Sequence, residues 1–187
     1  MQLLAFLWRR LTALVSTLLL LVVIAAAFIG YRLATFEQED DATHLAAKRD
    51  YLQRIGAAQP STAPRPNIVF ILYDDLGYGD IGAGADSGLI ATPHIEQLAA
   101  GGVTLADFHS PAPVCTPSRA GYLTGRLPAR AGMPNVVFPS GSIEEFFLGV
   151  LAAPNANVRI PAEEITLADL LGAAGYATGM VGKWHLG

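Results

Sequence analysis

The sequence predicts an α/β domain, a sheet flanked by helices, preceded by one N-terminal transmembrane helix. A continuous apolar run from Ile68 to Tyr73 is rich in β-forming residues and ends at two adjacent aspartates, which is typical of a central parallel strand. Capped helix patterns and further β-rich runs follow along the chain, as expected for an α/β fold. Ahead of this domain, a charge-free apolar segment is long enough to cross a bilayer.

The apolar segment covers residues 11–31 and carries no charge. About 20 such residues span a bilayer as a helix, and this run is apolar on every side, unlike a soluble surface helix. Arg9 and Arg10 precede it, and four acidic residues follow it. Because basic flanks stay on the cytoplasmic side, residues 1–10 are predicted to form a cytoplasmic tail.

The same segment also fits a cleavable signal sequence. Residues 11–24 have the length of an h-region, and the alanines at 25–27 offer a cleavage site. An uncleaved anchor is favoured, because the apolar run continues through Phe28 and Ile29. In either case we expect the rest of the chain outside the cytoplasm, in a periplasmic or extracellular space. The anchored form has the membrane as a partner.

Charge and cysteine content narrow the function classes. The net charge of -4 is modest, and the only basic cluster lies at the N-terminus, so nucleic acid is excluded as an expected partner. The single cysteine, Cys115, excludes an internal disulfide, although an exported protein is free to form one. We therefore look for a role of this single cysteine other than disulfide formation.

Residues 32–66 are predicted to form a linker. Within it, residues 41–58 have the spacing of a short amphipathic helix. The proline-rich stretch at 59–66 is typical of a spacer and marks a domain boundary. The globular domain is therefore expected over residues 67–187.

The first strand of this domain ends at a pair of carboxylates, Asp74 and Asp75. Ligands of open α/β sheets bind beyond the carboxyl ends of the strands. Two adjacent carboxylates repel each other unless a cation or protons intervene, and hard oxygen ligands favour Ca²⁺ or Mg²⁺. A turn or a helix cap explains an Asp-Asp pair about equally well.

Two further helix-strand units follow from local signals. Residues 92–101 begin with a Thr-Pro cap and end in glycine, which predicts a helix, and residues 103–108 are expected to form the next strand. Residues 166–175 show capping-box spacing and a terminal glycine, and residues 176–181 are expected to form another strand.

The segment 115–125 contains the cysteine and is the part of the sequence that says most about function. Thr116 is a good N-cap and Pro117 a good first helical residue, so a helix is predicted to begin there. Cys115 then lies at the positive end of a helix dipole, and Arg119 is one turn away with donors suited to an oxyanion. The combination indicates chemistry on a sulfate or phosphate ester. Taken alone, the cysteine equally fits a small buried apolar residue.

Lys183 and His185 follow the last predicted strand. In an extended segment the two side chains point the same way. A lysine and a histidine at a strand's carboxyl end are a plausible pair for binding an anion and transferring a proton. By itself this pair is a weak signal.

Three motifs together resemble the sulfatase family. Cys-Thr-Pro-Ser-Arg at 115–119, followed by Thr-Gly, resembles its first signature, with Tyr122 where an aliphatic residue is usual. Gly-Lys-Trp-His at 182–185 is similar to its second signature, and Asn67 begins a run similar to its opening strand and aspartate pair. The motifs stand in family order. The resemblance implies an alkaline-phosphatase-like sheet flanked by helices.

The resemblance also implies a mechanism centred on Cys115. In this family a formylglycine-generating enzyme oxidises the cysteine to formylglycine, an aldehyde. One hydroxyl of the hydrated aldehyde attacks the sulfur of a sulfate ester while Ca²⁺ and Arg119 stabilise the charge. The bond from sulfur to the ester oxygen breaks and the alcohol leaves. The second hydroxyl then loses its proton, sulfate is expelled and the aldehyde returns. Cys115 and Arg119 are thus predicted catalytic residues.

The remaining site roles come from the same resemblance. Asp74, Asp75 and position 115 are expected to bind the metal, Ca²⁺ in preference to Mg²⁺. Lys183 is expected to contact the sulfate group, and His185 to support the formylglycine as a catalytic residue.

Family members complete the metal and sulfate sites with later residues, an Asp-Asn pair and a distal histidine and lysine. Residues 67–187 hold none of these in the expected order, so we expect a partial catalytic domain with little activity of its own. Two alternatives remain open. One is a non-catalytic membrane-anchored fragment, and the other a phosphatase or phosphodiesterase of the same superfamily, which would prefer serine or threonine at position 115.

Overall fold

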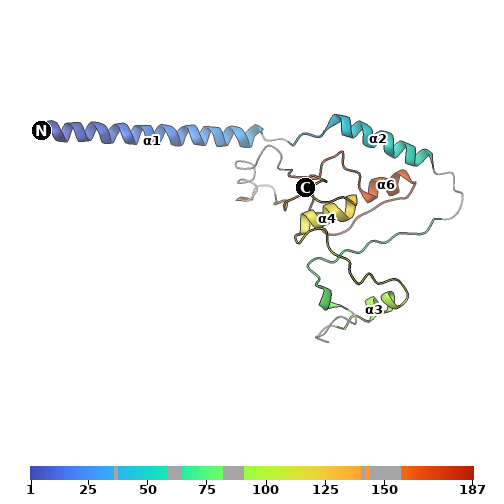
Figure 1. Cartoon of the computed structure of the whole chain (residues 1–187). Helices are drawn as coiled ribbons and strands as arrows, with labels where there is room; N and C mark the ends of the chain where they lie inside the picture. Colours follow the sequence, from blue (N-terminus) through green and yellow to red (C-terminus); the bar gives the residue numbers. More distant parts are fainter. Residues whose placement is uncertain (36–37, 59–64, 82–90, 140–141, 144–156) are drawn as a thin grey trace.

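A computed structural model describes residues 1–35, 38–58, 65–81, 91–139, 142–143 and 157–187. One long helix projects from a body of shorter helices and irregular segments (Figure 1). The α-helices are α1 (Gln2–Thr35), α2 (Ala42–Ala57), α3 (Pro93–Ala100), α4 (Cys115–Thr124) and α6 (Leu167–Ala173), and a short 3-10 turn spans Tyr78–Asp80.

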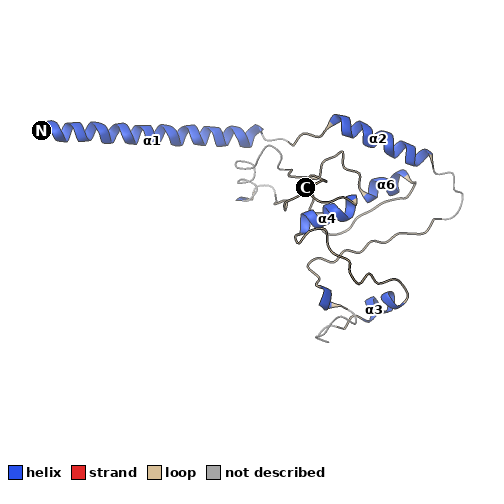
Figure 2. Ribbon diagram, in the orientation of Figure 1, coloured by secondary structure: helices blue, strands red, loops and turns tan. Residues whose placement is uncertain are grey.

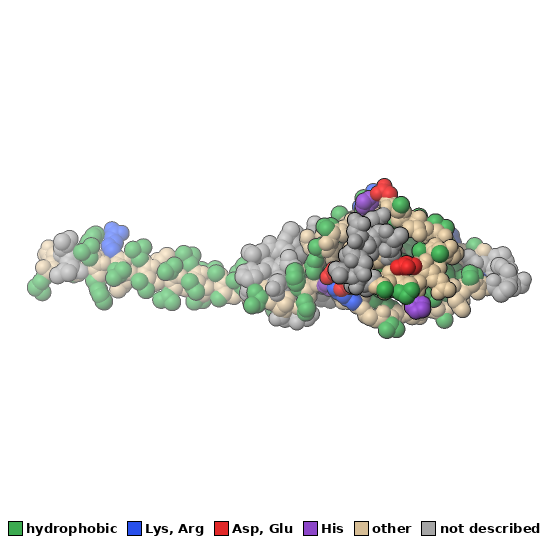
Figure 3. Space-filling view, turned by 90° about the horizontal axis from the view of Figure 1, so that it is seen from below, with side chains coloured by type: hydrophobic (Ala, Val, Ile, Leu, Met, Phe, Trp, Pro, Cys, Tyr) green, Lys and Arg blue, Asp and Glu red, His purple; other side chains and the backbone are tan. Residues whose placement is uncertain are grey.

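Helix α1 contains the predicted apolar segment and is apolar around its circumference. The window Ala5–Arg32 is long and apolar enough to cross a membrane, and none of it is buried against the body. Figure 3 shows hydrophobic side chains along the whole projecting helix, with basic side chains near its N-terminal end. Length and composition fit a membrane anchor and a signal sequence alike.

Helix α2 confirms the amphipathic helix predicted within residues 41–58. The Asp41 carboxylate caps it by accepting hydrogen bonds from the Thr43 and His44 amides, at 2.8 and 3.0 Å. One side of the helix is half-buried, with three- and four-residue spacing, and packs toward α6. This side comprises Leu45, Lys48, Leu52 and Ile55.

Helices α3 and α6 begin and end where their caps predict. Helix α3 starts after Thr92 and ends at Gly101. Helix α6 has a complete capping box, because the Thr166 hydroxyl accepts from the Asp169 amide and the Asp169 carboxylate accepts from the Thr166 amide.

The three predicted strands do not form in the part of the chain that the structure describes (Figure 2). Residues 68–73, 103–108 and 176–181 lack regular secondary structure, and the first stays exposed, with Val69 79% and Ile71 67% accessible. A strand depends on a neighbouring strand for its backbone hydrogen bonds and on covered faces for its side chains. The apolar pattern predicts that these segments are buried, but the described residues do not cover them.

A small core holds α4 in place. It consists of Ala120, Met133 and Leu186, which are fully buried, with Leu123, Val137 and Ile160 packed around them. The amide of Ile160 donates to the Leu186 carbonyl at 2.8 Å, which ties the C-terminal segment to residues 157–160. Helix α4 is therefore packed against the segment that follows Lys183.

Candidate active site

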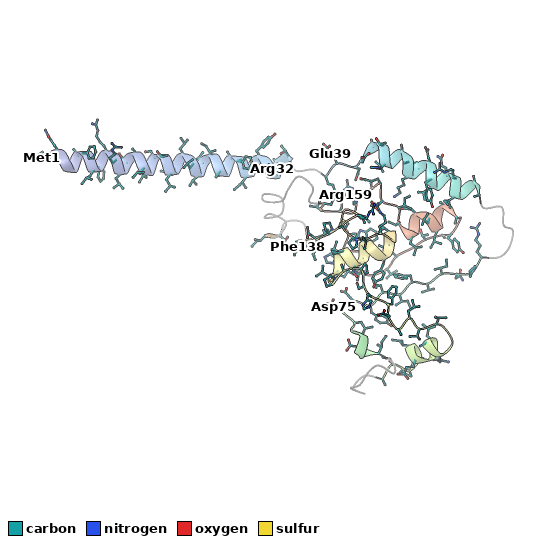
Figure 4. The ribbon with its side chains drawn as sticks, viewed as in Figure 1. Met1, Arg32, Glu39, Asp75, Phe138 and Arg159 are labelled. Atoms are coloured by element: carbon teal, nitrogen blue, oxygen red, sulfur yellow. The ribbon has the colours of Figure 1, made fainter. Side chains whose placement is uncertain are left out.

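A cavity of about 280 Å³ opens at the N-terminal end of α4. Asp74, Asp75, Cys115 and Arg119 line it, together with Ser118. In Figure 4, Asp75 lies beyond the end of α4, on the side of the body away from Arg159. The structure thus brings four of the six predicted site residues to one hollow from segments forty residues apart in the chain.

Helix α4 begins earlier than predicted. Its first residue is Cys115 and its N-cap is Val114, so Thr116 lies inside the first turn. Thr116 is fully buried, and its hydroxyl donates to the His185 carbonyl at 2.9 Å and accepts from the Val137 amide at 3.1 Å. The tertiary contacts of this hydroxyl replace the local capping bond on which the prediction rested.

Asp74 binds two cationic side chains. Its carboxylate accepts from Arg119 Nη2 at 3.0 Å and from Lys183 Nζ at 2.7 Å. Arg119, only 8% exposed, also donates to the Lys183 carbonyl at 2.6 Å. The hydrogen bonds from Lys183 and then Arg119 hold the pKa of Asp74 below its ordinary value, so this carboxylate is ionised at neutral pH.

Lys183 stands beside the cysteine as well as the aspartate. Its pKa is raised, first by the hydrogen bond to Asp74 and further by the Cys115 thiol. Lys183 therefore remains a cation next to position 115, where it is available to an anion.

A divalent cation fits the donor set in kind. Ligand atoms of Asp74, Asp75 and Cys115 lie within 4.8 Å of one another. Both aspartates offer hard oxygens, and each carboxylate has spare lone pairs beyond the bonds to Arg119 and Lys183. The charges of the two aspartates cancel those of the two cations, so a bound divalent ion leaves the site positive and attractive to an anion.

Comparison with known proteins identifies the family of this chain. The family model described as Sulfatase matches residues 66–187. The chain belongs to the sulfatase family. Membership implies the alkaline-phosphatase-like α/β fold, whose strands are not formed among the described residues.

Curated relatives support the same assignment. The chain is 47% identical to arylsulfatase A of Homo sapiens over 144 residues, which covers 76% of this chain and 25% of the relative. It is 44% identical to steryl-sulfatase of Rattus norvegicus over 143 residues, covering 76% and 23%. Arylsulfatase G of Rattus norvegicus is 43% identical over 126 residues, covering 67% and 21%. The chain thus spans about a quarter or less of these relatives' length. No solved structure matches it significantly.

Backbone strain in this sulfatase chain concentrates at predicted site residues. Among the described non-glycine residues, only Asp75 and His185 have positive φ, at 54° and 58°. Such conformations cost free energy and persist where the surroundings hold them, often at functional sites. Each of two motifs, the aspartate pair at 74–75 and the segment at 182–185, therefore contains a residue in this uncommon backbone conformation.

His185 lies behind the first turn of α4 and not in the cavity wall. Its Nε2 donates to the Val137 carbonyl at 2.9 Å, which leaves Nδ1 buried and without a partner among the described residues. Arg119 Nε is buried and unpartnered in the same sense. Buried polar atoms of this kind point to a missing neighbour.

Thr116 and Val137 support the site without having been predicted to do so. Thr116 lies in the cysteine motif, but its sequence context indicated a cap. Val137 bonds to Thr116 and His185 through its backbone while its side chain packs against the core, and no sequence signal marks it. The other three histidines stay outside the site: His44 pairs with Asp41 at the start of α2, His94 is exposed, and the exposed His109 pairs with Asp107 at 2.7 Å.

Proposed function

We propose that these residues form the cysteine-centred part of a sulfuric ester hydrolase that cleaves sulfate esters through a formylglycine made from Cys115. The observation that carries the proposal is the position of Cys115, at the N-terminus of α4 beside Lys183 and the Asp74–Asp75 pair. The relatives are named arylsulfatases and steryl-sulfatases, which supports sulfate esters as the substrate class.

Binding of the sulfate group falls to Lys183, Arg119 and the helix terminus. Lys183 Nζ and the guanidinium of Arg119 both reach Asp74, so the two cations lie close enough together to donate to one sulfate group beside position 115. The free amides of the first turn of α4 add positive potential at position 115. These groups stabilise negative charge as it develops on the sulfuryl oxygens.

Metal binding falls to Asp74, Asp75 and position 115. Bound Ca²⁺ would supply Lewis-acid polarisation of a sulfate oxygen. Ca²⁺ is preferred over Mg²⁺ because the carboxylates come from a bent, irregular segment, and calcium tolerates irregular oxygen geometry better.

Modification of Cys115 falls to a formylglycine-generating enzyme, which is the proposed protein partner. The hydrated aldehyde would supply the hydroxyl that attacks sulfur. His185 is proposed to support it, since the Nδ1 of its ring is buried without a hydrogen-bond partner among the described residues.

Export places this chemistry outside the cytoplasm. Helix α1 is proposed to anchor the chain in the membrane, with Arg9 and Arg10 on the cytoplasmic side. Protease treatment of intact cells is then expected to digest residues beyond 66. Full protection of those residues would contradict the proposed topology.

Peptide mass spectrometry across position 115 tests the proposed function. The full chain is produced with and without a formylglycine-generating enzyme, alongside a known sulfatase as a positive control. Conversion of Cys115 to the aldehyde is expected only with the enzyme, and Cys115→Ser is expected to stay unconverted. Free thiol alone, in a host that converts the control, would remove the proposed nucleophile.

A further inference from the structure

Gln38 joins the end of the membrane helix to the body through its side-chain amide. Its Oε1 accepts from the amides of Val158 and Arg159, at 3.0 and 3.1 Å, and its Nε2 donates to the Arg159 carbonyl at 3.0 Å. One side chain thus satisfies three backbone groups, as a neighbouring strand would.

Asp40 adds an ion pair at the same place. Both its oxygens accept from the Arg159 guanidinium at 2.8 Å, and Oδ1 also accepts from the Ala162 amide at 3.0 Å. The Asp40 side chain is only 22% exposed, and the hydrogen bond from Arg159 keeps its pKa below the ordinary value. Figure 4 shows Arg159 below the start of α2, close to Glu39.

Lys48 continues these contacts from α2. Its ammonium donates to the carbonyls of Ala162 and Glu164, at 3.0 and 2.7 Å, and pairs with Asp169 of α6 at 2.9 Å. The Lys48 side chain is only 17% exposed. We call Gln38, Asp40 and Lys48 the juxtamembrane clamp.

The clamp contacts the same packed unit that carries the site. Ile160, next to Arg159, donates to the carbonyl of the buried Leu186, and Gly187 packs so closely on Arg159 that a Cβ there would collide with it. The residue before Leu186 is His185, whose carbonyl binds Thr116 in the first turn of α4. Movement at the clamp therefore requires movement of the core beneath the cavity.

The clamp is also close to the end of the membrane helix. Helix α1 ends at Thr35, three residues before Gln38. At roughly 3.5 Å per residue, three residues reach at most about 11 Å. The clamped end of the body therefore lies within this short distance of the end of α1.

We propose that the juxtamembrane clamp docks the site-bearing body at a fixed height over the outer surface of the membrane. The lipid surface is the partner, and Gln38, Asp40 and Lys48 belong structurally to the catalytic unit. This proposal rests on the proposed role of α1 as a membrane anchor.

Distance from the membrane tests the proposal directly. Cys115 is the only cysteine, so a fluorescent donor attached to it in the unmodified full chain reports its distance to acceptor-labelled lipids in reconstituted vesicles. A narrow distance distribution is expected for the wild-type chain, and a broad one for the double variant Gln38→Ala with Asp40→Ala. The control is Glu39→Ala, an exposed position between them, which is expected to behave as wild type. Equal widths for wild type and double variant would overturn the proposal.

Amide exchange in detergent micelles gives a second measurement that needs neither vesicles nor activity. Loss of the charged partner in Asp40→Ala is expected to speed exchange of the Ala162 amide about tenfold. If that variant unfolds, Asp40→Asn keeps the side-chain shape and serves instead. Unchanged exchange would overturn the clamp. Failure of the chain to insert into vesicles would overturn both the fixed height of the body and the role of α1 as a membrane anchor. A thiol at Cys115 that stays unconverted in a host that modifies the control sulfatase would contradict only the proposed formylglycine chemistry.

Discussion

Thr116 provides the sharpest test of how the site is held. Thr116→Val removes the hydroxyl but keeps the shape, so no cavity forms and only the two hydrogen bonds are lost. The His185 carbonyl and the Val137 amide, both partly buried, then lose this partner. An unsatisfied buried group costs about 1–3 kcal/mol. Because these two groups are only partly buried, we take the lower end for each and expect a loss of about 2 kcal/mol in the free energy of unfolding.

The matched control is Thr116→Ser, which keeps the hydroxyl and loses one methyl group. Burial of a methyl group is worth about 0.8 kcal/mol, with a small cavity term added. The serine variant is therefore expected to be more stable than the valine variant, although valine is the more apolar residue. Urea unfolding of the full chain in detergent, followed by the fluorescence of the two tryptophans, measures both.

The position of His185 gives a second readout for the same variants. Because the Thr116 hydroxyl holds the His185 carbonyl, the valine variant is expected to shift the imidazole resonances of His185 and the serine variant to restore them. A valine variant as stable as wild type, with unshifted resonances, would refute the idea that this hydroxyl joins the two motifs.

Three further outcomes are expected. Asp74→Asn and Asp75→Asn each lower calcium affinity at least about tenfold by calorimetry, and unchanged affinity would exclude them as ligands. In the Asp40–Arg159 pair, the pKa of the Asp40 carboxylate is below 3.8, so the stability that the pair contributes is complete at neutral pH and is lost as the pH falls through that lower value. The chemical shift of the Ala162 amide is expected to titrate at that pH. A midpoint at or above 3.8 would contradict the prediction. The 187-residue polypeptide is expected to turn over a chromogenic aryl sulfate poorly, since the described donors Asp74, Asp75 and Cys115 offer fewer than the about six to eight oxygens that calcium takes. Robust turnover abolished by Cys115→Ala would contradict this.

Helix ends were predictable wherever a short-range bond decides them. Asp41 before α2 and the Thr166–Asp169 box before α6 act within four residues, so the sequence contains both partners. The start of α4 was predicted wrongly, because Thr116 bonds to residues 21 and 69 positions away. No local rule anticipates such a competitor.

The chemical identity of the site is a property of the sequence alone. The residue types in the three motifs indicate an anion site with oxygen ligands and a cysteine, and the family match agrees with that interpretation. The structure adds that Asp74, Asp75, Cys115 and Arg119 share one cavity, while their chemical roles remain predictions.

Tertiary structure alone decided how the motifs are joined and what the connector does. The bond from Thr116 to His185 and the clamp from Gln38 and Asp40 to Arg159 link residues 69 or more positions apart, and neither leaves a periodic or compositional mark in the sequence. The three predicted strands show the reverse case. Their apolar pattern is plain in the sequence, but a strand forms only where the tertiary structure supplies a neighbouring strand. Interactions between residues close in sequence can be predicted from the sequence, because both partners stand together in it. A bond between distant residues depends on where the whole fold places them.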